Sequence, residues 1–290
     1  MKVYRKNYVK IRRELHQIPE FGFDLPETQK YVTDKLDELG IPYKCSGTDS
    51  SIIAEIKGGQ PGKTVALRAD MDALKITEAN DVDYKSKHEG LMHACGHDNH
   101  IAMLLGAAKV LNAHKAEIKG NVRLLFQTAE ELSKGAEIMI KDGAMDGVDA
   151  VFGQHIGSII NKDIPAGKVI VTPGCCMASF DRFVIHVKGT GCHGSTPEKG
   201  TDPITMASHI VINLQEIIAR EVSAVKAAVV TIGYFHGGVA YNAIPSEVEI
   251  EGTIRALEEP IRQYLAKRLK RLQRVQQQHS EEQQKLRWTG

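Results

Sequence analysis

The pattern that most constrains the fold is an alternation of strand-like runs with helix-periodic segments along the first half of this 290-residue chain. Apolar residues between positions 31 and 39 share one helix face that stops at Gly40, since glycine tolerates the positive φ of a helix end. Residues 99–111 repeat the helical pattern. Strand-like runs stand at residues 51–56, 64–69, 122–126, 150–152 and 168–172. The alternation predicts a layered α/β domain over residues 1–175.

A different order of elements begins after Pro173-Gly174. We expect a strand over 180–188, a helix near 203–220, strands near 226–235 and 246–255, and a helix entered at Pro260. This β-α-β-β-α order is a ferredoxin-like sandwich without its last strand, so residues 176–275 are predicted to form a second, α+β domain. Residues 276–290 are basic and glutamine-rich, and we expect them to be disordered.

Composition and charge narrow the class of partner. The chain is 42% apolar and has 37 basic against 36 acidic residues, a net charge of +1, which favours neither nucleic acid nor a membrane surface. Its longest apolar stretch, residues 101–111, is far shorter than the ~20 residues of a membrane span. The N-terminal residues lack a signal-like apolar segment, and five cysteines are an odd number for a disulfide framework. We therefore expect a cytoplasmic protein that acts on a small molecule.

Potential metal ligands are densest in the run His93-Ala94-Cys95-Gly96-His97-Asp98-Asn99-His100. Imidazole and thiolate are preferred ligands of zinc and similar ions, and the intervening glycine lets Cys95 and His97 turn toward one point. The alternative interpretation is a polar loop in which Asp98 or Asn99 caps the helix that follows. Both interpretations can hold together, and we favour a metal site.

Further ligand-type residues follow three of the predicted strands. Asp70 and Asp72 come after the run at 64–69, Glu130-Glu131 after the run at 122–126, and His155 after the run at 150–152. Ligands of open α/β sheets bind beyond the carboxyl ends of the strands, so these side chains are expected to converge. Neighbouring side chains of an extended segment point in opposite directions, so one glutamate could bind metal while the other faces substrate.

Three residues of the second half are candidates for substrate binding. His193 lies in the glycine-flanked run Gly191-Cys192-His193-Gly194, Asn242 stands near a strand end, and Arg255 follows Gly252-Thr253-Ile254. The planar guanidinium of arginine suits a carboxylate, to which it donates two parallel hydrogen bonds. Each of these residues could instead be a turn residue or a surface charge.

Four motifs carry a resemblance to a known family. These are Leu67-Arg68-Ala69-Asp70-Met71-Asp72-Ala73-Leu74, the run from His93 to His100, Gln127-Thr128-Ala129-Glu130-Glu131, and Gly135-Ala136. Between about Leu15 and Leu265 the chain resembles the M20 metallopeptidases, and within them the amidohydrolase branch of hippurate hydrolase, auxin-conjugate hydrolases and N-acetyldiaminopimelate deacetylase. The resemblance implies a zinc-peptidase-like catalytic α/β domain and a ferredoxin-like lid domain that dimerises.

The same resemblance implies roles for individual residues. Cys95, His97, Glu131 and His155 would bind metal, which in this family is a pair of divalent ions such as zinc, manganese, cobalt or nickel. Glu130 would be the general base.

The resemblance also assigns roles around this centre. Asp70 would orient the site, His193 and Asn242 would stabilise the oxyanion, and Arg255 would hold the substrate carboxylate. His193 would reach the site of a partner in a homodimer, and the substrate would be an N-acyl amino acid.

The C-terminal sequence departs from the family pattern. Family chains continue well beyond this point, completing the lid and supplying a last metal-binding histidine, whereas His279 lies outside any family motif. We therefore expect the second metal site to be incomplete. The alternatives to an N-acyl amino acid amidohydrolase are a dipeptidase or aminopeptidase of the same family, and a truncated, non-catalytic relative that binds metal or a dimer partner.

Overall fold

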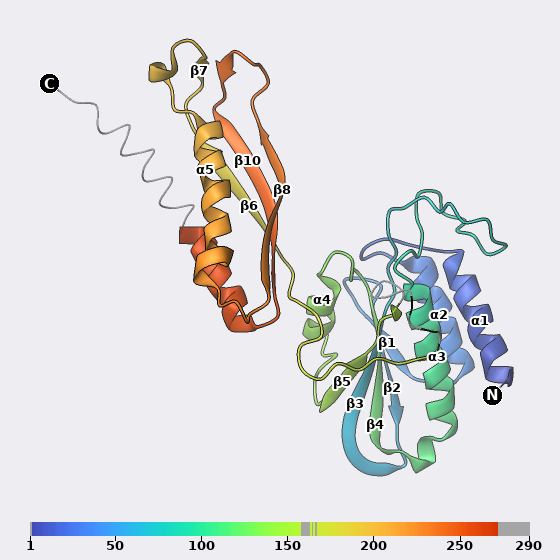
Figure 1. Ribbon diagram of the computed structural model, residues 1–290. Coiled ribbons are helices and arrows are strands. Elements are labelled where there is room, and N and C mark those ends of the chain that lie inside the picture. The colour runs from blue at the N-terminus through green and yellow to red at the C-terminus, as the bar shows by residue number, and fades with distance from the viewer. Residues whose placement is uncertain (1, 158–162, 164, 166, 272–290) are drawn as a thin grey trace. The chain divides into compact units, whose positions relative to one another are not determined.

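The computed structural model describes residues 2–157, 163, 165 and 167–271 (Figure 1). The chain divides into two compact units, residues 1–168 and 169–290, and each has a hydrophobic core of its own. The mixture of helices and sheets confirms the α/β class. None of the described helices combines the length and the apolar character that crossing a membrane requires. The predicted tail at 276–290 lies outside the described residues.

Unit 1, residues 1–168, is built on a five-stranded sheet in the order β1-β2-β4-β3-β5. Strand β3 runs parallel to both β4 and β5, so the carboxyl ends of these three strands meet at one edge of the sheet. The other two pairs, β1 with β2 and β2 with β4, are antiparallel. The strands span β1 (Tyr43–Cys45), β2 (Ile52–Lys57), β3 (Gln60–Asp70), β4 (Lys119–Gln127) and β5 (Ala150–Gly153).

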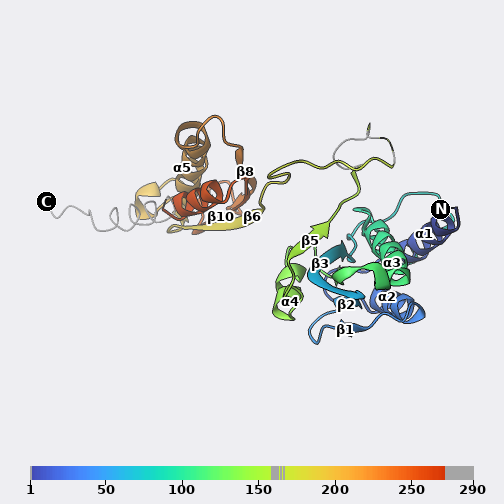
Figure 2. The ribbon, with the colours of Figure 1, turned by 90° about the horizontal axis from the view of Figure 1, so that it is seen from below.

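Helices cover both faces of this sheet, as Figures 1 and 2 show. One face packs against α1 (Lys2–His16), α2 (Pro26–Glu38) and α3 (His97–Ala113), with Leu124 and Phe126 of β4 fully buried beneath them. The short helix α4 (Gly135–Lys141) covers the other face through Met139. As expected, α2 ends just before Gly40, whose φ is +63°.

One predicted strand does not form. The run at 168–172 is apolar and β-branched, yet Val169, Ile170 and Val171 are 77%, 63% and 81% exposed and belong to none of the described strands. A high β propensity reflects the fit to a half-buried pleated surface, so without a neighbouring strand it does not produce a strand. The prediction at 168–172 was therefore wrong.

Unit 2, residues 169–290, has a three-stranded antiparallel sheet with helices on one face. Its strands, in spatial order, are β6 (Asp181–Lys188), β10 (Glu247–Ala256) and β8 (Ala228–Gly237). Helix α5 (Pro203–Glu216) and the helical residues 259–271 bury their apolar sides against this sheet. A separate two-stranded sheet pairs β7 (Cys192–His193) with β9 (Ala243–Ile244).

Candidate metal centre

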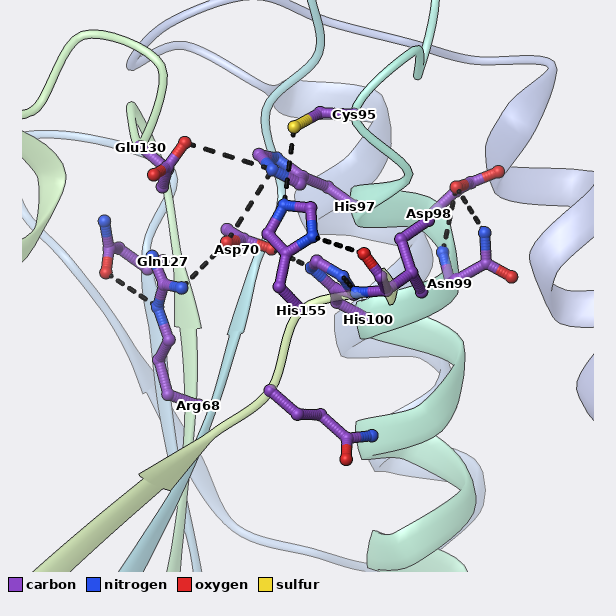
Figure 3. Close-up of polar contacts among 12 residues, drawn as sticks. Arg68, Asp70, Cys95, His97, Asp98, Asn99, His100, Gln127, Glu130 and His155 are labelled. Atoms are coloured by element: carbon purple, nitrogen blue, oxygen red, sulfur yellow. Dashed lines mark hydrogen bonds and ion pairs between the residues drawn. The ribbon is translucent and has the colours of Figure 1, made fainter. Parts of the chain in front are cut away.

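The carboxyl edge of the unit 1 sheet gathers the ligand-type residues that the sequence singles out (Figure 3). Asp70 ends β3, Glu130 follows β4, and His155 follows β5. The first residue of α3, His97, points into the space between them, and Cys95 stands just before it. The helix start has Gly96 as its N-cap with no side-chain cap, so neither Asp98 nor Asn99 takes the capping position that the alternative interpretation requires.

His97 is the residue that the other groups share. Its Nδ1 donates to the carbonyl oxygen of Asp72 at 2.7 Å, which leaves the lone pair of Nε2 directed away from that bond. Nε2 lies 3.7 Å from Asp70 Oδ2 and 3.9 Å from both Glu130 Oε2 and Glu131 Oε1. It is buried without a hydrogen-bond partner among the described residues. A buried lone pair that faces carboxylates is an arrangement that a bound cation would satisfy.

Cys95 and His155 complete a second group around the same histidine. Cys95 Sγ lies 3.4 Å from His155 Nε2, while His155 Nδ1 is 3.0 Å from the carbonyl oxygen of Ile156, to which it donates. The ligand atoms of Cys95, His97 and His155 all lie within 4.8 Å of one another. Burial and the neighbouring Glu131 raise the pKa of the Cys95 thiol to about 12, so its thiolate form needs a nearby cation.

The two glutamates lie in a turn that Asp72 fixes. The Asp72 carboxylate accepts the backbone N–H groups of Glu130 and Glu131, each at 3.0 Å, and Ala129 adopts a positive φ of 48°. Both carboxylates approach His97, so the expectation that they point in opposite directions was wrong: it assumed extended backbone. They differ in access, because the Glu130 side chain is 39% exposed and that of Glu131 17%.

Gly135 packs against the backbone of Thr128, at the start of the turn that carries the two glutamates. A Cβ atom at position 135 would lie 1.6 Å from the carbonyl oxygen of Thr128. We expect Gly135→Ala to lower the free energy of unfolding by about 1–3 kcal/mol and to weaken metal binding. The control is Gly106→Ala within α3, where an added Cβ meets no atom within 4 Å, and it should raise stability by about 0.5–1 kcal/mol. Urea unfolding of both variants measures the difference, and an alanine at 135 that costs nothing would contradict this packing.

Asp70 is held as an acceptor by two donors. His100 Nδ1 lies 2.5 Å from Asp70 Oδ1, and Arg68 donates to Asp70 Oδ2 at 2.7 Å. Ile156 N–H donates to His100 Nε2, so His100 carries its proton on Nδ1. Burial alone would raise the pKa of Asp70, but the hydrogen bond from His100 and the charge of the Arg68 guanidinium lower it well below its usual range.

His100 and the Asp72 carboxylate have structural roles that the sequence motifs did not predict. The signal for His100 was its spacing, because residues three apart on a helix lie on the same face as His97. No local pattern linked Asp72 to the backbone of residues 130 and 131, since that contact joins segments 58 and 59 positions apart.

The residues present at this edge fit a divalent ion. Two of their buried ligand atoms, His97 Nε2 and Glu131 Oε1, have no hydrogen-bond partner within the described part of the chain. Thiol, imidazole and carboxylate together form the donor set of zinc and neighbouring transition metals. The three groups whose ligand atoms lie within 4.8 Å of one another are Cys95, His97 and His155; Asp70, His97 and His100; and His97, Glu130 and Glu131.

The candidate residues of unit 2 fall into two places. His193 in β7 pairs with Ala243, and Gly194 N–H donates to the carbonyl oxygen of Asn242, so His193 and Asn242 are brought together. Arg255 lies at the carboxyl end of strand β10, with its guanidinium carbon 4.2 Å from the centre of the Phe180 ring.

The separation of these two places follows from strand geometry. Strand β10 begins at Glu247, shortly after Asn242, and reaches Arg255 eight residues later, a length of roughly 25 Å at about 3.3 Å per residue. Within one copy of unit 2, Arg255 therefore does not join His193 and Asn242.

Several characterised proteins are similar in sequence to most of this chain. It is 43% identical to the N-acetyl-L-cysteine deacetylase of Bacillus subtilis over 91% of its own length and 62% of that protein. It is 42% identical to the N-acyl-L-amino acid amidohydrolase of Geobacillus stearothermophilus, over 90% of its own length and 70% of the relative. The chain thus spans less than two thirds of the length of the first of these relatives.

Solved structures and a family model agree with these relatives. The Bacillus subtilis YXEP protein, described as a dinuclear metal-binding peptidase of the M20 family, matches 95% of this chain and 71% of its own with 37% identity and a TM-score of 0.80. A second structure, described as a putative aminohydrolase from methicillin-resistant Staphylococcus aureus, is 38% identical and has a TM-score of 0.90. The match covers 97% of this chain and 74% of the Staphylococcus chain. The model of the peptidase family M20/M25/M40 matches residues 66–284. The convergent His97 site, the identities and this match together place the chain in the peptidase family M20/M25/M40, to which it belongs.

Proposed function

We propose that the chain is a metal-dependent amidohydrolase that cleaves N-acyl amino acids into a carboxylic acid and a free amino acid. The observation that carries this proposal is the buried Nε2 of His97, which has no hydrogen-bond partner among the residues that the structure describes. It faces the carboxylates of Glu130 and Glu131 and lies beside Cys95 and His155. The Geobacillus relative, named an N-acyl-L-amino acid amidohydrolase, supports the substrate class.

The metal ligands in this proposal are Cys95, His97, Glu131 and His155, with two divalent ions per subunit drawn from zinc, manganese, cobalt or nickel. A divalent ion supplies Lewis acidity toward the amide carbonyl and toward water. The chain's own residues then set the geometry: Asp72 fixes the backbone of Glu131, and the Asp72 carbonyl fixes the tautomer of His97. The Asp70 carboxylate places a negative charge next to His97, and its hydrogen bond with His100 fixes its position.

Glu130 is the proposed general base. Burial raises the pKa of its carboxyl, as do Glu131 and Asp70, and this makes its carboxylate a stronger base than an ordinary glutamate. As water adds to the amide carbon, one water proton passes to a Glu130 oxygen. The same proton passes to the amine nitrogen as the carbon–nitrogen bond breaks.

We assign substrate binding to unit 2. His193 and Asn242 would donate hydrogen bonds to the carbonyl oxygen as negative charge develops on it, and Arg255 would bind the carboxylate of the amino acid. The length of β10 between the two places supports a homodimer, because His193 and Arg255 of one copy lie too far apart to hold one small substrate. Residues 1–175 would then be the catalytic domain and residues 176–275 the lid and dimerisation domain.

The cysteines bear on the compartment. All five cysteines of the chain lie within the described residues and are free thiols, which supports a reducing, cytoplasmic environment.

Hydrolysis assays with added metal test the proposed function. The purified chain, stripped with a chelator and reloaded separately with each of the four metals, is offered N-acetyl amino acids and, in parallel, free dipeptides. We expect release of free amino acid from the N-acetyl substrates, no release by the stripped protein, and recovery when metal returns. Faster cleavage of dipeptides would assign the chain to the peptidases of the family instead. Failure to cleave either class with any of the four metals would overturn the proposal.

A further inference from the structure

Behind the candidate metal centre lies a second group of buried charges that the proposed chemistry does not use. Asp98 follows His97 in the first turn of α3 and is completely buried. Its Oδ2 lies 2.7 Å from His16 Nδ1 and 2.9 Å from Arg12 Nε, both on α1, and its Oδ1 accepts the backbone N–H of Asn99 at 2.9 Å. The start of α3 is thus attached to α1 by a hydrogen bond from His16 and an ion pair with Arg12.

His16 lies between two carboxylates. Its Nε2 is 3.2 Å from Glu78 Oε1, while its Nδ1 contacts Asp98, and all three side chains are buried. Carboxylate oxygens accept hydrogen bonds, so both ring nitrogens donate and His16 is an imidazolium. Burial opposes this charge, but the bonds to Asp98 and Glu78 outweigh it and raise the pKa of His16. Arg12 and His16 together balance the charges of the two carboxylates.

Each of the two carboxylates also accepts a backbone N–H. Glu78 Oε2 accepts that of Ser86 at 2.7 Å, in the segment before Cys95, and Asp98 Oδ1 accepts that of Asn99 in the first turn of α3. The turn itself contains Gly96 at φ +89° and has no side-chain cap, so its own residues constrain it weakly.

We propose that His16 is a positioning residue for the metal centre: by donating to Asp98 at the start of α3, it fixes the turn that carries Cys95 and His97. The inference rests on the proposed function only in taking Cys95 and His97 as metal ligands. Groups one step removed from a metal typically change its affinity by about 10–100-fold when they are replaced. His16 is such a group, acting from a helix more than eighty positions earlier in the chain.

Two isosteric variants separate positioning from simple loss of charge. The amide nitrogen of asparagine can take the place of His Nδ1, and that of glutamine the place of His Nε2. His16→Asn therefore keeps the donor to Asp98 and loses the one to Glu78, whereas His16→Gln does the reverse. Both remove the same charge from the same buried position. The matched control is His114→Gln: His114 is the exposed C-cap residue of α3, the helix that carries Asp98, and it pairs with Glu117.

Metal affinity and the Co²⁺ spectrum of the full chain, measured without substrate, provide the readouts. We expect His16→Gln to weaken metal binding by about 10–100-fold and to shift the thiolate-to-cobalt absorption of Cys95. His16→Asn should stay within about threefold of the unsubstituted chain with an unshifted band, and His114→Gln should be unchanged. Urea unfolding of the same samples reports stability separately.

Equal effects of the asparagine and glutamine variants, or none, would overturn the proposal. If His16→Gln does not fold, Arg12→Gln removes the other α1 cation paired with Asp98 and should weaken binding and shift the band in the same direction; wild-type behaviour of Arg12→Gln would then overturn the proposal. Failure of the unsubstituted chain to hydrolyse amides contradicts the proposed function alone, because no readout here requires turnover.

Discussion

Replacing Glu130 with glutamine is expected to slow hydrolysis of an N-acetyl amino acid by about 10²–10⁴-fold, the range typical for loss of a general base. Glutamine keeps the size of the side chain and its backbone bond to Asp72, but it cannot take a proton from water. The metal content of the variant should match that of the unsubstituted chain, since a base is not a ligand. Initial rates and elemental analysis on the same preparation measure both quantities.

The control for this substitution is Glu137→Gln in α4, where the glutamate is exposed and pairs with Lys134. It makes the same chemical change in a neighbouring segment and should leave the rate unaltered. Loss of metal together with activity in the Glu130 variant would reverse the assignment of the Glu130-Glu131 pair. Full activity without Glu130 would remove it from the mechanism.

Replacing Cys95 with alanine is expected to weaken metal binding by more than about 100-fold, beyond the range for groups that touch only a ligand. The variant removes a thiolate donor from the group in which Cys95, His97 and His155 lie together. Because metal affinity depends on deprotonated ligands, loss of a thiolate should also reduce the number of protons released on binding. Competition with a chromophoric chelator measures the affinity.

Cys175→Ala is the matched control, since Cys175 is exposed and free. It should bind metal as the unsubstituted chain does. Unchanged affinity in Cys95→Ala would return this cysteine to an ordinary structural thiol and leave His97, His155 and the carboxylates as the candidate ligands.

The central strands of unit 1 and the place of the metal centre could be predicted from local sequence patterns. Strands β2, β3, β4 and β5 coincide with apolar runs, and the parallel order of three of them explains why Asp70, Glu130 and His155 meet at one edge. The density of ligand types between His93 and His100 pointed to the same place. Helix α3 begins at His97, two residues earlier than its apolar pattern predicts.

What could not be predicted depends on contacts between distant segments. His16 reaches Asp98 across 82 positions, and Asp72 reaches Glu130 across 58, so no spacing in the sequence reveals either contact. The turn after β4 overrides the alternation of an extended chain and brings both glutamates toward His97. The run at 168–172 has the composition of a strand. It forms none because it pairs with no strand among the described residues, and its apolar side chains are exposed.

Metal content per chain tests the central claim most directly. The chain is stripped, reloaded with each of zinc, manganese, cobalt and nickel, passed through gel filtration and analysed for metal and protein. We expect one to two ions per chain for at least one of the four metals, with nearly two where the centre is complete, and a marked loss of metal in Cys95→Ala. A chain that retains none of these metals, although it is folded by urea unfolding, would contradict the assignment of Cys95, His97, Glu131 and His155 as a metal centre.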